Sequence, residues 1–208
     1  MSYKDFTLEQ INQIFAIAIQ SNLDVFSAHK QPVQIDSAFV SRLDYNTTLA
    51  LAINTEKARS EMIIAPILVE LKRLTGDRIS LFSGSEFNVD VAQGLNGFGD
   101  FIISLSSQQL YIEAPVAVIV EAKNENIKGG LAQCLATMIA AQRFNQQKGN
   151  AIDTLYGAVT TGNQWKFLKL DDTTAAIDSK DYYIDQLADI MGILLAMVES
   201  NTSLITIA

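Results

Sequence analysis

The sequence predicts an α/β fold in which a mixed central β-sheet is flanked by helices, with extra helices at the N- and C-terminal ends. Apolar residues at positions 55–76 recur at helical spacing. Positions 79–123 instead contain short apolar runs separated by Gly, Asn and Ser, which is typical of successive strands in an antiparallel meander. A helical pattern over 126–149 then leads to another strand, and this order adds a parallel neighbour to the sheet.

Composition indicates a compact globular chain, which we expect to form a single domain over residues 1–208. Apolar residues make up 49% and charged residues 18% of the sequence, a balance that excludes a disordered chain. The polar start lacks the features of a signal peptide, no apolar run is long enough to span a membrane, and a single cysteine, Cys134, excludes a disulfide framework. We therefore expect a cytoplasmic protein with no membrane partner.

Residues 1–54 are expected to form an N-terminal helical extension. A capping box that begins at Thr7 precedes helical apolar spacing over residues 8–20. Two short helices, over 36–43 and 46–53, are expected to follow, with a turn between them.

Residues 55–170 are expected to form the core of the fold. Its first helix should begin at Thr55, kink at Pro66 because proline has no N–H for the helix ladder, and stop at Gly76. Asn126 is suited to cap the later helix. The expected strands are the apolar runs at residues 79–84, 86–91, 97–105, 115–123, 155–162 and 165–171, with a short strand at 174–178 beyond the core.

Residues 171–208 form an acidic C-terminal segment with an apolar helix. The segment holds seven acidic residues and one lysine, so it supplies −6 of the net charge of −8. Asp181 is suited to cap a helix over residues 182–200, whose apolar residues cover more than one face. Such a helix packs either on the core of its own chain or against a second copy of the chain. A homodimer formed through this helix is therefore one of the two arrangements that we expect.

The charge balance is reversed between positions 123 and 169, which contain six basic and two acidic residues. This local excess predicts a basic surface that nucleic-acid phosphates can contact, despite the negative total charge. It is weaker than the basic stripe of a dedicated DNA-binding domain.

The run at residues 114–120 is apolar throughout and predicts a strand that is buried on both faces. It ends in Glu121 and Lys123, which lie on the same face of the strand because side chains alternate. A charged pair at the carboxyl end of a central strand is either a structural ion pair or a functional site. Because buried ion pairs add little net stability, we favour the site.

An acid on one strand followed by Glu-x-Lys on the next resembles the PD-(D/E)XK nuclease superfamily. The residues that carry the resemblance are Asp100 in GFGDF, Glu121 and Lys123 in VEAKN, and Glu61 in ARSEMII on the preceding long helix. The resemblance spans roughly residues 55–170 and implies a restriction-endonuclease-like core.

The resemblance also implies a metal-dependent nuclease that hydrolyses phosphodiester bonds, with DNA favoured over RNA and with Mg²⁺, or Mn²⁺ in its place, as cofactor. Asp100, Glu121 and the Ala122 carbonyl are the implied ligands of one ion, and Glu61 is the implied ligand of a second ion or of a metal-bound water. Lys123 is implied to orient or deprotonate the attacking water and to stabilise the transition-state charge.

Gln133 is an auxiliary candidate. Some branches of the superfamily carry a glutamine on the helix after Glu-x-Lys and a tyrosine four residues later; here Gln133 fits the first position and Thr137 occupies the second. The alternative function is a catalytically inactive nuclease-fold module for binding or assembly, which the acidic C-terminal segment and the apolar final helix motivate.

Overall fold

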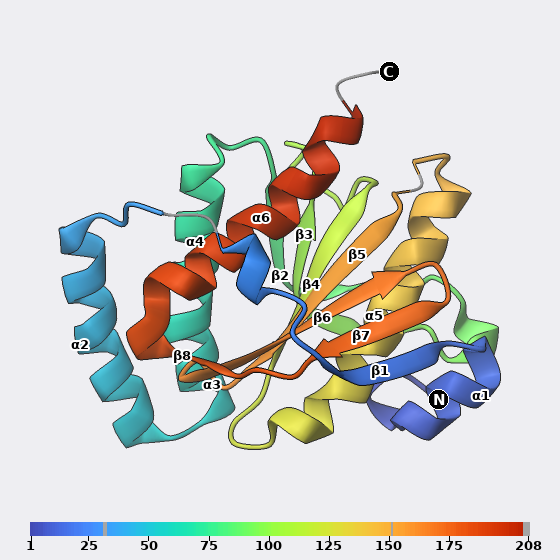
Figure 1. Cartoon of the computed structure of the whole chain (residues 1–208), viewed down its shortest axis with the longest axis horizontal. Helices are drawn as coiled ribbons and strands as arrows, with labels where there is room; N and C mark the ends of the chain where they lie inside the picture. The colour runs from blue at the N-terminus through green and yellow to red at the C-terminus, as the bar shows by residue number, and fades with distance from the viewer. Residues whose placement is uncertain (31–32, 151, 206–208) are drawn as a thin grey trace.

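The computed structural model describes residues 1–30, 33–150 and 152–205. A mixed eight-stranded sheet runs through the centre, between two layers of helices (Figure 1). The strand order is β1-β7-β6-β5-β4-β3-β2, and β8 pairs with β6 outside this path. The strands are β1 (Ala18–Leu23), β2 (Ser80–Glu86), β3 (Phe98–Ser104), β4 (Val116–Ala122), β5 (Thr154–Thr160), β6 (Gln164–Asp171), β7 (Thr174–Asp178) and β8 (Tyr182–Tyr183).

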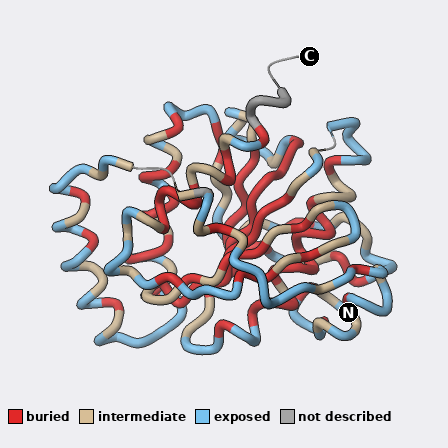
Figure 2. The backbone as a smooth tube through the Cα atoms, in the orientation of Figure 1, coloured by how far each residue is buried: buried red, intermediate tan, exposed pale blue. Residues whose placement is uncertain are grey.

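The predicted mixture of parallel and antiparallel pairs is present. Strands β2, β3 and β4 are antiparallel neighbours, whereas β4 and β5 are parallel and are connected by helix α5 (Ile127–Gln147). Asn126 caps α5 as predicted, because its side-chain oxygen accepts the N–H of Gly129 at 3.0 Å. Strand β4 therefore lies in the middle of the sheet, and all of its residues are buried (Figure 2).

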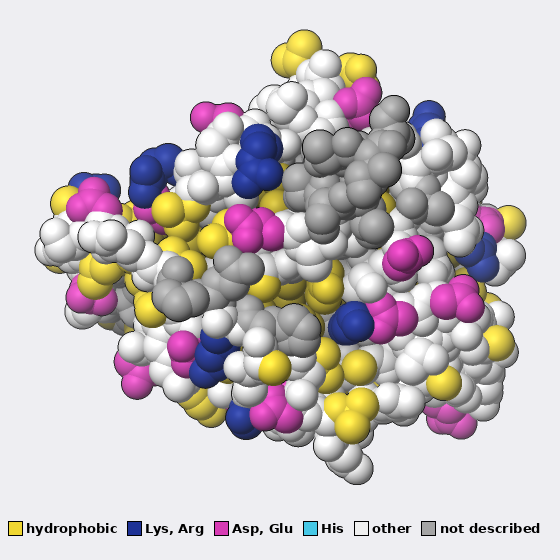
Figure 3. Space-filling model, turned by 45° about the horizontal axis from the view of Figure 1, so that its top comes forward, with side chains coloured by type: hydrophobic (Ala, Val, Ile, Leu, Met, Phe, Trp, Pro, Cys, Tyr) yellow, Lys and Arg dark blue, Asp and Glu magenta, His cyan; other side chains and the backbone are white. Residues whose placement is uncertain are grey.

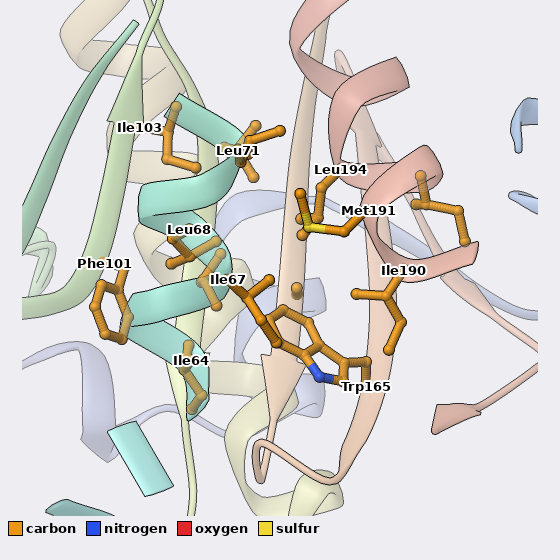
Figure 4. Packing of buried hydrophobic residues seen from close by; sticks show 14 of the residues in the cluster. Ile64, Ile67, Leu68, Leu71, Phe101, Ile103, Trp165, Ile190, Met191 and Leu194 are labelled. Atoms are coloured by element: carbon orange, nitrogen blue, oxygen red, sulfur yellow. The ribbon is translucent and has the colours of Figure 1, made fainter. Parts of the chain in front are cut away.

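Helices cover both faces of the sheet. On one face, side chains of α4 (Ala65–Leu74) and α6 (Leu187–Ile205) meet strand residues such as Phe101 and Trp165 (Figure 4). On the other face, α1 and α5 pack on strand residues such as Ile119. The helices of the first face are α2 (Ser37–Ile53), α3 (Glu56–Arg59), α4 (Ala65–Leu74) and α6 (Leu187–Ile205), and those of the second are α1 (Leu8–Phe15) and α5.

The N-terminal segment contains a strand, so the expectation of a wholly helical extension is wrong. Helix α1 ends at Phe15, because Ala16 adopts a left-handed conformation with φ of 55° that stops the helix. Strand β1 follows at once and pairs in parallel with β7 at the edge of the sheet. Pairing with a distant strand thus outweighs the helical spacing of residues 8–20, and it extends the sheet beyond the core that was expected to end at residue 170.

Two further expectations about local structure are wrong. Residues 36–53 form one helix, α2 with its cap, because the buried residues lie on one continuous face. Residues 86–91 do not form a strand, since β2 ends at Glu86 and Asp90 begins the short turn η4 (Val91–Gln93). The meander therefore has three strands where four were expected.

The first core helix begins where predicted, with Thr55 as its N-cap, and it is irregular just before Pro66. Helix α3 leads into the π-helical turn η3 (Ser60–Ile64), in which the Ala65 N–H bonds to the Ser60 carbonyl. The proline ring crowds the preceding helical turn, and proline has no N–H to donate to a carbonyl of that turn. The wider π turn accommodates both effects. The irregularity predicted at this proline is thus a π turn.

The C-terminal helix α6 begins at Leu187, later than predicted, because the preceding tyrosines form β8 and pair with β6. The acids of this segment are partly engaged within the chain, with Asp189 bonded to Lys30 and Asp181 bonded to Lys166. Six apolar residues of α6 are buried in the chain's own core, so these six do not need a second chain to cover them: Ile190, Met191, Ile193, Leu194, Met197 and Val198.

Candidate active site

Asp100 and Glu121 lie directly opposite each other on neighbouring strands. Phe101 pairs with Val120 and Ile102 with Ile119 in the antiparallel ladder of β3 and β4, and the same register places Asp100 across from Glu121. Directly opposed residues of an antiparallel pair have Cβ atoms about 5 Å apart and point to the same face. The two acids therefore meet at the end of the sheet where β4 finishes and α5 begins, which is the lower end in Figure 1.

Lys123 and Gln133 complete this cluster. The Lys123 ammonium donates to Glu121 Oε1 at 2.6 Å and to Gln133 Oε1 at 3.2 Å. Asp100 is held by the strand end itself, because its Oδ2 accepts the Ala122 N–H at 2.8 Å. The structure thus brings together Asp100, Glu121, Ala122, Lys123 and Gln133, five of the six residues that the sequence singled out.

The lysine side chain reaches Glu121 across a glycine of α5. A Cβ at Gly130 would lie 3.1 Å from Cγ and from Cε of Lys123, and 2.6 Å from Cγ1 of Val159. The main chain of Lys123 is fixed as well, since its N–H donates to the Thr160 carbonyl at 2.8 Å. The absence of a side chain at Gly130 therefore lets the lysine stem lie between α5 and the sheet.

Burial gives the cluster unusual acid–base properties. Glu121 is only 1% exposed. This burial and the neighbouring Asp100 carboxyl raise the pKa of Glu121 to about 8, although Lys123 has the opposite effect. Burial by itself lowers the pKa of Lys123, but Glu121, Asp100 and Glu56 outweigh it, so the pKa of Lys123 is raised. Lys123 is therefore a permanent cation at neutral pH.

Glu61 is the one predicted residue that the structure does not bring into this cluster. Its carboxylate is mostly exposed and pairs with Lys57 at 2.5 Å on the same helix face. Among the residues that the structure describes, it forms no hydrogen bond or ion pair with Asp100, Glu121 or Lys123. The π turn at η3 changes the helical phase of this segment, so simple helical spacing cannot place Glu61.

Glu56, on the same helical segment as Glu61, is a further acid whose charge affects Lys123. It is the first residue of α3, directly after the cap Thr55, and its charge contributes to the raised pKa of Lys123. Glu56 was not singled out in the sequence, where its only signal is its place in the first turn of the helix.

A pocket of about 330 Å³ opens beside the cluster. Its wall includes the N-terminal turn η1 (Tyr3–Asp5), which is pinned to the chain because the Tyr3 N–H donates to the Asn96 carbonyl at 3.1 Å and its hydroxyl donates to the Phe87 carbonyl. No sequence pattern predicts that the N-terminal residues line this pocket. The residues that line the pocket are Ser2, Tyr3, Lys4, Asn96, Gly97, Phe98, Asp100 and Gln133.

The donor set of the cluster fits a hard divalent cation. Glu121 Oε2 is buried and has no hydrogen-bond partner among the residues that the structure describes, and the neighbouring Asp100 carboxyl makes the ionised form of Glu121 still less favourable. A cation between the two carboxylates would give the unpaired Glu121 oxygen a partner and would offset the repulsion between the two acids. The described residues contain no group of three or more His, Cys, Asp or Glu side chains suited to a metal. Two carboxylates plus waters are nevertheless a usual protein contribution to Mg²⁺.

The basic surface expected from residues 123–169 is largely neutralised. Four of its six bases form ion pairs, Lys123 with Glu121, Arg143 with Asp90, Lys166 with Asp181 and Lys169 with Asp171. On the face that Figure 3 shows, basic and acidic side chains are likewise interspersed. The segment therefore does not supply a broad cationic surface.

A scan against models of protein families found no match for this sequence. A search of curated proteins also found no significant match. Within the described part of the chain, none of the helices combines the length and the apolar character that crossing a membrane requires.

Proposed function

We propose that this protein is a metal-dependent nuclease that hydrolyses phosphodiester bonds, with DNA favoured over RNA as its substrate. The observation that carries the proposal is the opposition of Asp100 and Glu121 on neighbouring strands, with the Lys123 ammonium 2.6 Å from Glu121. A purely structural ion pair needs one acid and one base. The second acid makes the pair electrostatically unfavourable unless a further positive charge enters.

The chemistry follows from the positions of these groups. Asp100 and Glu121, with the Ala122 carbonyl, would hold Mg²⁺ or Mn²⁺, which when bound neutralises charge on the phosphate and lowers the pKa of a water. Because the pKa of Lys123 is raised, its role is that of a cation that stabilises the charge of the transition state and orients the water, rather than that of a general base. Gln133 holds the ammonium in place through its Oε1.

The proposal extends to the type of fold. The order of an α3–α4 helical segment, the β2–β3–β4 meander, α5 and the parallel strand β5 supports a restriction-endonuclease-like core, similar to the PD-(D/E)XK superfamily. Strands β6, β7, β1 and β8 enlarge the sheet beyond such a core. Fold alone does not assign an activity, so the proposal depends on the site.

Cleavage of plasmid DNA, single-stranded DNA and RNA with Mg²⁺ or Mn²⁺ tests the proposal. We expect metal-dependent cleavage by the wild type and its reduction by about 100-fold or more in Asp100→Asn, which keeps the shape but removes the charge. Glu113→Gln is the matched control, because Glu113 is an exposed acid in the connection at the opposite end of the same hairpin. A folded wild type that cuts none of these substrates would contradict the proposal and favour the inactive binding module.

A further inference from the structure

The pocket beside the cluster shares two residues with it, Asp100 and Gln133, so a group bound there lies next to the proposed metal site. Its volume of about 330 Å³ is of the size of one nucleotide rather than of a duplex. Its wall is rigid on the N-terminal side, since the turn η1 is bonded to Asn96 and Phe87 and packs on α5. The pocket is thus a built part of the fold.

Phe98 gives this pocket an aromatic surface. It lies two residues before Asp100 on β3, so both side chains point to the same face of the strand. Phe98 is 63% exposed, which is unusual for a large apolar residue at the start of a buried strand. Neither hydrophobic core formed by the described residues includes Phe98, so packing within this part of the chain does not explain its position.

The polar lining is of a kind that recognises a nucleotide. Lys4 contributes an exposed ammonium group, and Asn96 and Gln133 contribute amides, within one pocket. The neutralised bases of residues 123–169 offer no broad surface on which the two phosphate strands of a duplex could lie. One aromatic face and one lysine instead suit an unpaired base and its phosphate.

We infer that this pocket binds one unpaired nucleotide of a single-stranded nucleic acid, with its base stacked on Phe98 and an adjoining phosphate near Lys4. This inference rests on the proposed function, because it assigns the substrate class of the same site. It makes single strands, or single-stranded ends and flaps, the substrates, since a paired base cannot enter a pocket of this size without leaving its helix. Phe98 and Lys4 are then substrate-binding residues.

The test combines binding and cleavage. Fluorescence anisotropy with labelled single-stranded DNA, single-stranded RNA and blunt duplex DNA in Ca²⁺ measures affinity, and steady-state cleavage in Mn²⁺ separates KM from kcat. We expect Phe98→Ala to weaken single-strand binding by about 5- to 150-fold, the range for loss of one stacked base, and to raise KM with little change in kcat. Phe98→Tyr should retain binding.

Tyr111→Ala is the matched control, because Tyr111 is 57% exposed and lies in the connection at the other end of the same hairpin. Wild-type affinity in Phe98→Ala, equal weakening in Tyr111→Ala, or preference for the blunt duplex would each overturn the inference. Cleavage with a KM unaffected by Phe98→Ala would overturn it while leaving the nuclease proposal intact. Single-strand binding that depends on Phe98, without any cleavage by the wild type, would support the pocket and contradict the nuclease.

Discussion

Alanine in place of Lys123 is expected to reduce metal-dependent cleavage by about 100- to 10,000-fold while the protein stays folded. The ammonium is the fixed positive charge beside the two acids, and its raised pKa keeps it charged at neutral pH. Removing it deprives the transition state of that charge. The fold tolerates the change because Glu121, with a pKa of about 8, takes up a proton rather than remaining as an uncompensated buried charge.

Single-turnover cleavage rates, with circular dichroism to verify folding, measure this effect. Lys148→Ala is the control, since Lys148 is an exposed lysine just after the far end of α5. A folded Lys123→Ala protein that cleaves at the wild-type rate would remove Lys123 from the mechanism. Equal losses in the two variants would indicate a general effect of positive charge on substrate binding instead.

Glutamine in place of Glu121 is expected to raise the free energy of unfolding of the metal-free protein by about 2–5 kcal/mol at pH 9, while abolishing cleavage. In the folded chain the carboxyl keeps its proton up to a pKa of about 8, whereas its ordinary value is 4.5. The stability linked to this group is therefore fully present below pH 4.5 and is lost as the pH rises through about 8. Glutamine is neutral throughout, so the variant avoids that loss.

Urea denaturation between pH 5 and 9, in the presence of a chelator, compares the two proteins. We expect the wild type to lose stability relative to Glu121→Gln across this range. Glu70→Gln is the control, because Glu70 is also buried but accepts two hydrogen bonds from Arg73, at 2.6 and 2.8 Å. We expect its substitution not to raise the free energy of unfolding. Parallel pH profiles for the wild type and Glu121→Gln would show that burial does not hold the Glu121 proton.

The part of the site that could be predicted depends on strand alternation. The apolar run up to Val120 indicated a buried strand, and the period of two then placed Glu121 and Lys123 on one face. Asp100 could be assigned to the neighbouring strand because three consecutive strands form a meander with short-range connections. The Asn126 cap and the parallel pairing of β4 with β5 were predictable for the same local reasons.

The remaining features depend on contacts between distant segments or on a local irregularity. Pairing of β1 with β7 joins residues about 155 positions apart, and helical spacing near residue 18 gave no sign of it. The N-terminal wall of the pocket likewise depends on bonds from Tyr3 to Asn96 and Phe87. The π turn before Pro66 alters the helical phase at Glu61, which pairs with Lys57 outside the cluster, so helical spacing does not predict its place.

Titration of the wild type with Mn²⁺, by calorimetry or by the loss of free-ion electron paramagnetic resonance signal, tests the central claim most directly. The opposed carboxylates predict saturable binding of Mn²⁺, weakened by about tenfold or more in both Asp100→Asn and Glu121→Gln and unchanged in Glu113→Gln. Millimolar Mn²⁺ that fails to bind, or that binds equally well to all four proteins, would contradict a metal site between Asp100 and Glu121.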